Sequence, residues 1–324
     1  MEHVMSSTAY CYTSDKDSHV FSIFLRNTRQ HNDLSQEQFC LYLREQSSLF
    51  YNLDTITVSR WERGVNIPSL AKQAEIVELY NHELVDIYGK DNEFLNECTK
   101  LLALPINKRK SYHPYYHNDA YLIEEIDNEH PCFHLILGMI LQYEGNPCLS
   151  LDEIDRQRKQ LAQLKINVAT AFGGQIIGHC LFMETRSHII LELLNFKINL
   201  QDITHQDAQG QANAVLVLSS AGATTQIENS LMSIYMYFFA SQKHLTYLSF
   251  SVCDDSFVKK LNGAKLSPFK VKSVSKGKNK VDITSFLVSR SEVMANRFLL
   301  KLAVISPSNL NQIIDVGVKG KQAR

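Results

Sequence analysis

The sequence has 324 residues, a mass of 37.0 kDa and a formal net charge of -1 at pH 7. This length favours two domains, and 44% hydrophobic against 21% charged residues is typical of a soluble globular protein. The near-neutral charge excludes a global basic field, so any contact with nucleic acid must be local. The N-terminus has no basic segment followed by an apolar core, and no apolar run is long enough to span a bilayer. We therefore expect a cytoplasmic protein with no membrane partner.

Seven cysteines are scattered along the chain without a C-x-x-C pair. Their odd number and spacing argue against a disulfide framework or a zinc ribbon, so we expect most of them to be small buried side chains. Two H-x-x-x-H spacings are formed by His113, His117, His130 and His134. Such a spacing gathers a metal pair only on a helix, and Pro114 and Pro131 oppose a helix there. We therefore expect no metal site and no cofactor.

The first 19 residues are polar and serine-rich and predict a flexible arm. From residue 20 to 103 the apolar residues recur at three- and four-residue intervals, which predicts a bundle of four or five short helices. Ser35, Asp54 and Ser69 precede apolar runs and are the expected N-caps. Prolines, basic residues and aromatic residues at 104–119 then indicate a linker.

Strands and helices are interleaved in residues 120–290, and residues 291–324 form a helical tail that is expected to break at Pro307. The expected strands are 121–126, 165–172, 176–185, 189–199, 214–220, 245–252, 268–275 and 281–290. The expected helices are 131–145, 150–164, 225–243 and 254–263. The predicted fold class is therefore α+β with two domains, an all-α bundle followed by a mixed α/β domain.

The only tryptophan lies in the stretch ITVSRWERG, within the third predicted helix. Val58 and Trp61 share one helix face and should pack inward. This leaves an outer face made of Thr55, Ile56, Ser59 and Arg60. The guanidinium group of Arg60 can bind two acceptors on a guanine edge, so this face suits a DNA major groove.

The segments LRNTRQHNDLSQEQFCLYL and ITVSRWERGVNIPSL resemble the Xre/Cro family of helix-turn-helix DNA-binding domains over roughly Phe21 to Tyr88. The resemblance implies a dimer that binds double-stranded DNA at a palindromic operator. It implies DNA contacts by Gln36, Thr55, Ile56, Thr57, Ser59, Arg60 and Arg63. It implies structural roles for Arg29, Val58, Trp61, Glu62 and Gly64, with Arg29 and Glu62 forming an ion pair and Gly64 ending the helix.

Two features depart from that family. The segment REQSSLFYNLD makes the connection between the second and third helices about eight residues longer than usual. The loop VNIP lacks the lysines and arginines that family members often carry, and Asp54 lies nearby. We therefore expect modest non-specific affinity and a binding mode that depends on dimer formation. Helical domains of this kind are also used for protein contacts alone.

The element order after residue 120 resembles the fold of GCN5-related N-acetyltransferases, supported by NVATAFGGQIIGHCLF and LTYLSFSVCDDSFVKKLNGAKLSPF. Family members hold acetyl-CoA on an R/Q-x-x-G-x-G/A turn, but this chain has SSAGATTQIENS with Gly222 as its one glycine and no basic residue. Many members have a tyrosine that protonates the leaving thiolate, and Lys259 stands at that position here. Many also have a Gly-Phe pair, which is Gly263-Ala264 in this chain. The resemblance therefore implies the fold without catalysis.

These patterns together predict a bacterial-type transcriptional regulator that is cytoplasmic and associated with the nucleoid when bound to DNA. Its acetyltransferase-like domain would serve dimerisation or the sensing of a small-molecule or acyl-CoA-like effector. The candidate effector residues are Ser219, Gly222, Tyr235 and Tyr237. Two alternatives remain open: a DNA-tethered N-acetyltransferase that uses acetyl-CoA, and an antitoxin-like interaction protein that only autoregulates.

Overall fold

A computed structural model of the chain describes residues 19–102, 121–127, 129–130, 133–134, 138, 164–171, 174–195, 197–198, 212–252, 255–276 and 279–322. The chain divides into two units, Met1–Asp91 and Asn92–Arg324. Most of the expected helices at 131–145 and 150–164, the arm before residue 19 and the linker at 104–119 lie outside the described residues, as do His113 and His117.

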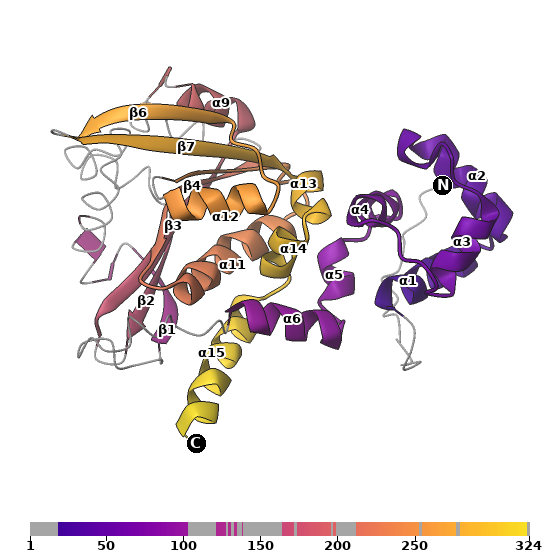
Figure 1. Ribbon diagram of the computed structural model, residues 1–324, viewed down its shortest axis with the longest axis horizontal. Coiled ribbons are helices and arrows are strands. Elements are labelled where there is room, and N and C mark those ends of the chain that lie inside the picture. The colour runs from indigo at the N-terminus through magenta and orange to yellow at the C-terminus, as the bar shows by residue number, and fades with distance from the viewer. Residues whose placement is uncertain are drawn as a thin grey trace. The chain divides into compact units, whose positions relative to one another are not determined.

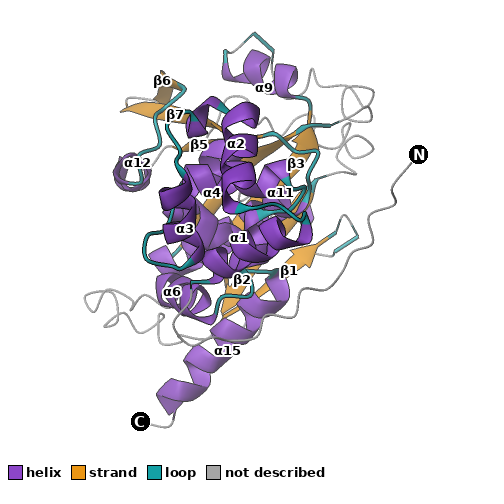
Figure 2. Ribbon diagram, turned by 90° about the vertical axis from the view of Figure 1, so that its right-hand side faces the viewer, coloured by secondary structure: helices purple, strands orange, loops and turns teal. Residues whose placement is uncertain are grey.

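The described part of the first unit contains helices and loops without a strand (Figure 2). Its elements are α1 (Val20–His31), α2 (Gln36–Gln46), the short 3-10 helix η1 (Ser48–Phe50), α3 (Thr55–Glu62), α4 (Leu70–Leu79) and α5 (Leu84–Tyr88). The three expected N-caps are confirmed. Ser35, Asp54 and Ser69 each accept a hydrogen bond from the backbone N–H three residues later, and Ser35 completes a capping box with Gln38.

The segment between α2 and α3 is anchored to the core of the first unit. Phe50 is fully buried and Leu53 is nearly so. The Cys40 thiol donates to the carbonyl oxygen of Leu53 at 3.3 Å. Burial of two large side chains from eight residues stabilises the segment, so it connects the two helices along a defined path.

The second unit contains a seven-stranded sheet in the order β1-β2-β3-β4-β5-β7-β6 (Figure 1). Its strands are β1 (Tyr121–Ile126), β2 (Lys165–Ala171), β3 (Ile176–Thr185), β4 (Ala214–Gly222), β5 (Tyr247–Val252), β6 (Lys270–Lys276) and β7 (Asn279–Ser289). The β4–β5 pair is parallel and the other neighbouring pairs are antiparallel. The mixed α/β architecture that the sequence predicted is thus present.

Successive residues of a strand point to opposite faces of the sheet, and a different helix packs on each face. Ile166, Val168 and Leu216 belong to one apolar cluster with α9 (Ser187–Leu194). The other face packs against α11 (Thr225–Ser241), which contacts β3 and β4. The short helix α12 (Asp255–Gly263) follows β5.

The strand expected at 189–199 is wrong, because residues 187–194 form the helix α9. Its buried residues are Ile189, Ile190, Leu193 and Leu194, which recur at one- and four-residue intervals and line one side of a helix. A short, continuous apolar run fits either a buried strand or a buried helix, so the apolar pattern alone could not decide between them.

The C-terminal tail is helical and is interrupted just before Pro307 as expected, with a second break at Asn296. The described helices are α13 (Arg290–Ala295), α14 (Arg297–Ala303) and α15 (Pro307–Gln322). Asn296 separates the first two and caps α14 through its side chain. Pro307 begins a helix instead of ending one, because a proline at the first helical position needs no N–H partner.

Helix α6 (Asn92–Leu102) lies in the second unit, although the sequence placed residues up to 103 with the helical bundle. It packs against α11 and α14. The Glu97 carboxylate accepts from Arg297 at 2.8 Å and from Lys301 at 2.7 Å, which ties α6 to α14.

Candidate functional site

The helix α3 is held in place by a buried cluster of polar contacts. Arg29 of α1 donates to both carboxylate oxygens of Glu62, at 2.5 Å and 3.1 Å. Gln36 of α2 donates to Glu62 Oε2 at 2.7 Å, and Arg26 donates to the Glu62 carbonyl oxygen at 2.6 Å. Glu62 is 2% exposed, so one carboxylate joins three helices in the interior of the unit. The Glu62 carboxylate in turn raises the pKa of Arg29, chiefly through the hydrogen bond.

The end of α3 is fixed by a glycine in a left-handed conformation. Gly64 has a φ of +72°. Its N–H donates to the Trp61 carbonyl oxygen at 3.1 Å, and the N–H of Val65 donates to the Arg60 carbonyl oxygen at 3.0 Å. These two bonds form a Schellman motif, which satisfies carbonyl groups at the end of the helix.

The exposure of the α3 residues follows the predicted division into two faces. Val58 and Trp61 are buried, at 0% and 4% exposure. The ammonium of Lys72 lies 5.8 Å from the Trp61 ring centre. On the outer side Thr55, Ile56, Arg60 and Arg63 are exposed, and Thr57 and Ser59 are half-buried. The outer face therefore offers hydroxyl, methyl and guanidinium groups to a partner.

Gln36 behaves differently from the expectation that its amide would meet a phosphate. The amide nitrogen donates to Glu62 instead, so in this structure it serves the internal cluster. Sequence reasoning missed this contact because Gln36 and Glu62 are 26 residues apart. The only signal was the pairing of Glu62 with Arg29, because each oxygen of a paired carboxylate can still accept a second hydrogen bond.

The charge of the first unit is acidic over its described residues. Residues 19–91 contain seven lysines and arginines against ten aspartates and glutamates. Asp54 caps α3 through a 2.6 Å bond from Thr57 N–H, and hydrogen bonds from the side chain and then the backbone of Thr57 lower the pKa of its carboxyl group. Attraction to a polyanion must therefore come from local exposed cations, such as Arg60 and Arg63, and not from the unit as a whole.

In the second unit, β4 and β5 separate toward their C-terminal ends. They pair from Ala214 to Val217 and from Tyr247 to Phe250, whereas β4 continues to Gly222. The turn that follows β4 is the segment SSAGATTQIENS, which the sequence resemblance to acetyltransferases places at their acetyl-CoA turn. The residues of this turn decide whether acetyl-CoA can be held here.

That turn fits a pyrophosphate poorly. A Cβ atom on Gly222 would lie 2.5 Å from the backbone nitrogen of Glu228, so this glycine allows β4 to approach the first turn of α11. Thr224 accepts the N–H of Ile227, and the N–H of Ala223 donates to Ile177. Two potential anion donors are thus already used, and the carboxylate of Glu228 in the first turn of α11 opposes a bound anion.

Lys259 is exposed on α12. The sequence resemblance places it where acetyltransferases have a proton-donating tyrosine. Its neighbour Lys260 is more unusual. The Lys260 ammonium donates to Asn229 Oδ1 at 2.5 Å and lies 5.4 Å from the Phe298 ring centre, and burial lowers its pKa. Asn229 also donates to the carbonyl oxygen of Leu101 at 3.1 Å. Lys260 thus belongs to a contact that joins α12, α11 and α6.

The structure separates the four candidate effector residues. Ser219 lies on the sheet and bonds to His179 Nε2 at 2.7 Å, and burial lowers the pKa of His179 to about 4. Gly222 packs against α11, and Tyr235 is fully buried with its hydroxyl bonded to Ser220. Tyr237 alone of the four lines a cavity of about 320 Å³.

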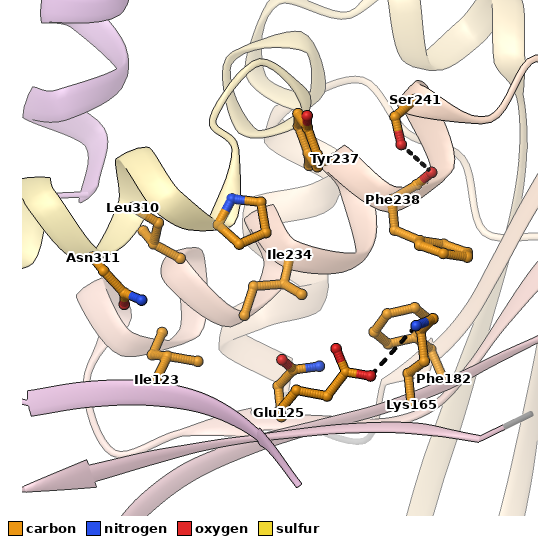
Figure 3. Close-up of a pocket in the computed structure, with 12 residues that line it drawn as sticks. Ile123, Glu125, Lys165, Phe182, Ile234, Tyr237, Phe238, Ser241, Leu310 and Asn311 are labelled. Atoms are coloured by element: carbon orange, nitrogen blue, oxygen red, sulfur yellow. Dashed lines mark hydrogen bonds and ion pairs between the residues drawn. The ribbon is translucent and has the colours of Figure 1, made fainter. Parts of the chain in front are cut away.

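That cavity is open to solvent on one side and is lined by residues of β1, β2, β3, α11 and the start of α15 (Figure 3). Its polar lining includes Lys165, Glu125, Asn167 and Asn311, which sequence reasoning did not single out. The available signal was weak, because Asn167 is one polar residue in the otherwise apolar core of a strand. Placing it on a cavity wall needs the position of α15, which is 140 residues away in the chain.

The described residues offer neither a metal site nor a membrane-spanning helix. No group of three or more histidine, cysteine or carboxylate side chains among them could hold a metal ion. No helix in the described part of the chain is long and apolar enough to cross a membrane. The described cysteines, Cys40, Cys98 and Cys180, are free thiols and buried, as expected.

Comparisons with known proteins give matches in structure only. No family model matches the sequence, and no curated protein matches it. Among solved structures, Arabidopsis thaliana NAA60 in complex with acetyl-CoA matches with a TM-score of 0.37 and 11% identity over 52% of this chain and 98% of its own. An N-acetyltransferase from Staphylococcus aureus matches with a TM-score of 0.35 and 14% identity over the same shares. A Corynebacterium glutamicum protein described as histone acetyltransferase HPA2 and related acetyltransferase gives 0.33 and 10%, over 52% and 96%. At these values the description of the second unit depends on its own strand order and pairing.

Proposed function

We propose that this protein is a sequence-specific DNA-binding transcriptional regulator. Its first unit reads the DNA major groove through α3, and two copies act together as a dimer on a palindromic operator. Its second unit has an acetyltransferase-like fold that works without catalysis, in dimerisation or in sensing an effector.

One observation carries the DNA-binding part of this proposal. The inner face of α3 is held by the buried Glu62 cluster, while Thr55, Ile56 and Arg60 of the same helix are exposed. A rigid helix that exposes the guanidinium of Arg60, the hydroxyl of Thr55 and the apolar side chain of Ile56 suits direct reading of base edges. The net acidity of the unit restricts non-specific attraction, which favours selection by base contacts over binding to any DNA.

The non-catalytic reading of the second unit is supported by its acetyl-CoA turn. The one glycine of this turn, Gly222, is packed closely against α11. The first turn of α11 carries the carboxylate of Glu228 and no basic residue, so it would repel a pyrophosphate. A ligand-sensing or dimerisation role needs none of these groups.

The test is selection of bound sequences from random DNA by the full-length protein, followed by binding of the selected site to the Arg60→Ala variant. We expect the wild type to enrich a palindromic sequence and Arg60→Ala to lose the preference for one base pair per half-site, about 10- to 100-fold in affinity. Arg44→Ala is the matched control, since it removes an exposed guanidinium from α2. Enrichment of no sequence by the wild type, or equal selectivity in Arg60→Ala, would reject α3 as the reader.

A second candidate is a DNA-tethered N-acetyltransferase, which the separation of β4 and β5 favours. Such an enzyme would transfer the acetyl group of acetyl-CoA to an amine and release the coenzyme A thiol. Calorimetry with acetyl-CoA separates the two candidates. Micromolar affinity would support the enzyme, whereas the poor fit of the turn leads us to expect no saturable binding.

A further inference from the structure

The cavity in the second unit is lined by polar groups at its edge and by apolar groups inside. Its volume of about 320 Å³ is within the range of small-molecule sites. Phe182 of β3, Ile234 of α11 and Leu310 of α15 lie on its walls (Figure 3). An apolar body of a ligand would therefore be removed from water on several sides.

Asn167 provides a buried amide on the wall of this cavity. It is 6% exposed, and it points away from Ile166 and Val168, which belong to the cluster beneath α9. Within the described part of the chain its side-chain amide has no hydrogen bond. The amide lines the cavity, so a ligand that offers a donor or an acceptor there can form a hydrogen bond with it.

A cation and an anion lie side by side at the rim. Lys165 Nζ is 3.4 Å from Glu125 Oε1 and 5.3 Å from the Phe238 ring centre (Figure 3). The two side chains are 38% and 58% exposed, so this ion pair contributes little to stability and opens at little cost. Each of the two charges can therefore turn to a ligand group of the opposite sign.

The charges and the amides together select a ligand class. A simple anion would be repelled by Glu125, and a simple cation by Lys165. A zwitterion satisfies both, and amide groups of Asn167 and Asn311 can bond its carboxylate or ammonium. Among the described residues that line the cavity Lys165 is the only basic one, so they offer a pyrophosphate-bearing molecule such as an acyl-CoA few of its usual counter-charges.

We propose that this cavity binds a small zwitterion with an apolar body, with the chemistry of a free aromatic or branched-chain α-amino acid. The ammonium lies against Glu125, the carboxylate against Lys165 and the amide of Asn167, and the apolar side chain against Phe182 and Ile234. As an effector site this deepens the proposed function and rests on it, because the ligand would then adjust DNA binding.

The test is isothermal titration calorimetry of the full-length protein, without DNA, with phenylalanine, tyrosine, leucine and isoleucine. We expect saturable binding of at least one amino acid. We expect loss of tenfold or more in affinity when either charge is removed from the ligand, using 3-phenylpropionate and phenethylamine as analogues. No saturable binding of any of the four up to about 10 mM would overturn the proposal.

Variants then locate the binding in this cavity. We expect the Lys165→Met and Asn167→Leu variants each to bind the amino acid with at least tenfold lower affinity. Lys270→Met is the matched control, because that lysine also makes a 3.1 Å contact, to Asn195, outside the cavity. Unchanged affinity in Lys165→Met and Asn167→Leu variants with wild-type circular dichroism would overturn the assignment. Calorimetry needs no DNA, so a wild type that selects no operator but binds the amino acid would reject the proposed function and leave this site standing.

Discussion

Arg29 and Glu62 face each other across the first unit in a two-bond contact, with Nε to Oε1 at 2.5 Å and Nη2 to Oε2 at 3.1 Å. The Glu62 side chain is 3% exposed and that of Arg29 is 14% exposed. The pair joins the first helix of the unit to the helix whose outer face we propose as the DNA reader. Its geometry therefore links the stability of the unit to the orientation of α3.

The first prediction is that Glu62→Ala destabilises the unit by about 3–5 kcal/mol, because it leaves the Arg29 guanidinium buried without its counter-charge. The same change also removes the acceptor of Gln36. The only tryptophan of the chain, Trp61, lies beside Glu62, so urea unfolding followed by tryptophan emission reports on this unit.

The control for this prediction is Glu45→Ala, which removes an exposed carboxylate from α2 and should change the midpoint little. Gln36→Ala removes one hydrogen bond to the same carboxylate, so we expect a smaller loss of about 1 kcal/mol. Equal midpoints for Glu62→Ala and Glu45→Ala would show that the buried pair contributes nothing to folding.

The second prediction concerns Gly64, whose φ of +72° lies in the left-handed region. A Cβ atom there would meet Ser22 Oγ at 3.7 Å, which is an ordinary contact, so the cost of Gly64→Ala comes from the backbone and not from crowding. We expect a loss of about 1–2 kcal/mol in the tryptophan-detected unfolding. Gly89→Ala is the matched control, since its φ is −65° and alanine is tolerated there.

The helices of the first unit could be predicted well from the sequence because their signals are local. N-caps, apolar spacing and the glycine after α3 lie within a few residues of the structure that they determine. The partner of Gln36 could not be predicted in this way. It depends on a three-dimensional approach of α2 to α3 across the connecting segment, which the buried Phe50 and Leu53 determine.

Prediction was weaker for the second unit, where long-range packing decides the outcome. The other expected strands were recovered with small differences at their ends, but the apolar run of α9 was assigned to a strand because a continuous apolar run fits both states. The cavity was missed altogether. Its walls come from β2, α11 and α15, so no local pattern marks Lys165 or Asn167 as neighbours of Asn311.

The third prediction tests whether Gly222 serves packing or a cofactor. Gly222→Ala should destabilise the second unit by about 1–3 kcal/mol, because the new Cβ atom would lie 2.5 Å from the Glu228 nitrogen and α11 must shift. The measurement is urea unfolding by circular dichroism. Gly263→Ala, with no atom within 4 Å of its added Cβ, is the control. A variant of normal stability that loses acetyl-CoA affinity would instead assign this glycine to a cofactor turn.

His179 gives the second unit a predicted pH dependence. Its side chain lies 9% exposed on β3, bonded to Ser219 of β4, and burial lowers its pKa from 6.5 to about 4. Below pH 6.5 the unfolded chain binds a proton that the folded chain does not take up until about pH 4. The free energy of unfolding therefore falls as the pH drops through this window.

The fourth prediction is that wild-type stability decreases by about 3 kcal/mol between pH 6.5 and pH 4 through His179, at 1.36 kcal/mol for each pH unit. His179→Gln cannot take up this proton, so its unfolding free energy should vary less across the same window. His188→Gln, which replaces an exposed histidine of α9, should retain the wild-type slope. Urea unfolding by circular dichroism at half-unit pH steps measures all three. Equal slopes for the wild type and His179→Gln would mean that His179 is already protonated in the folded state at neutral pH or is accessible to water.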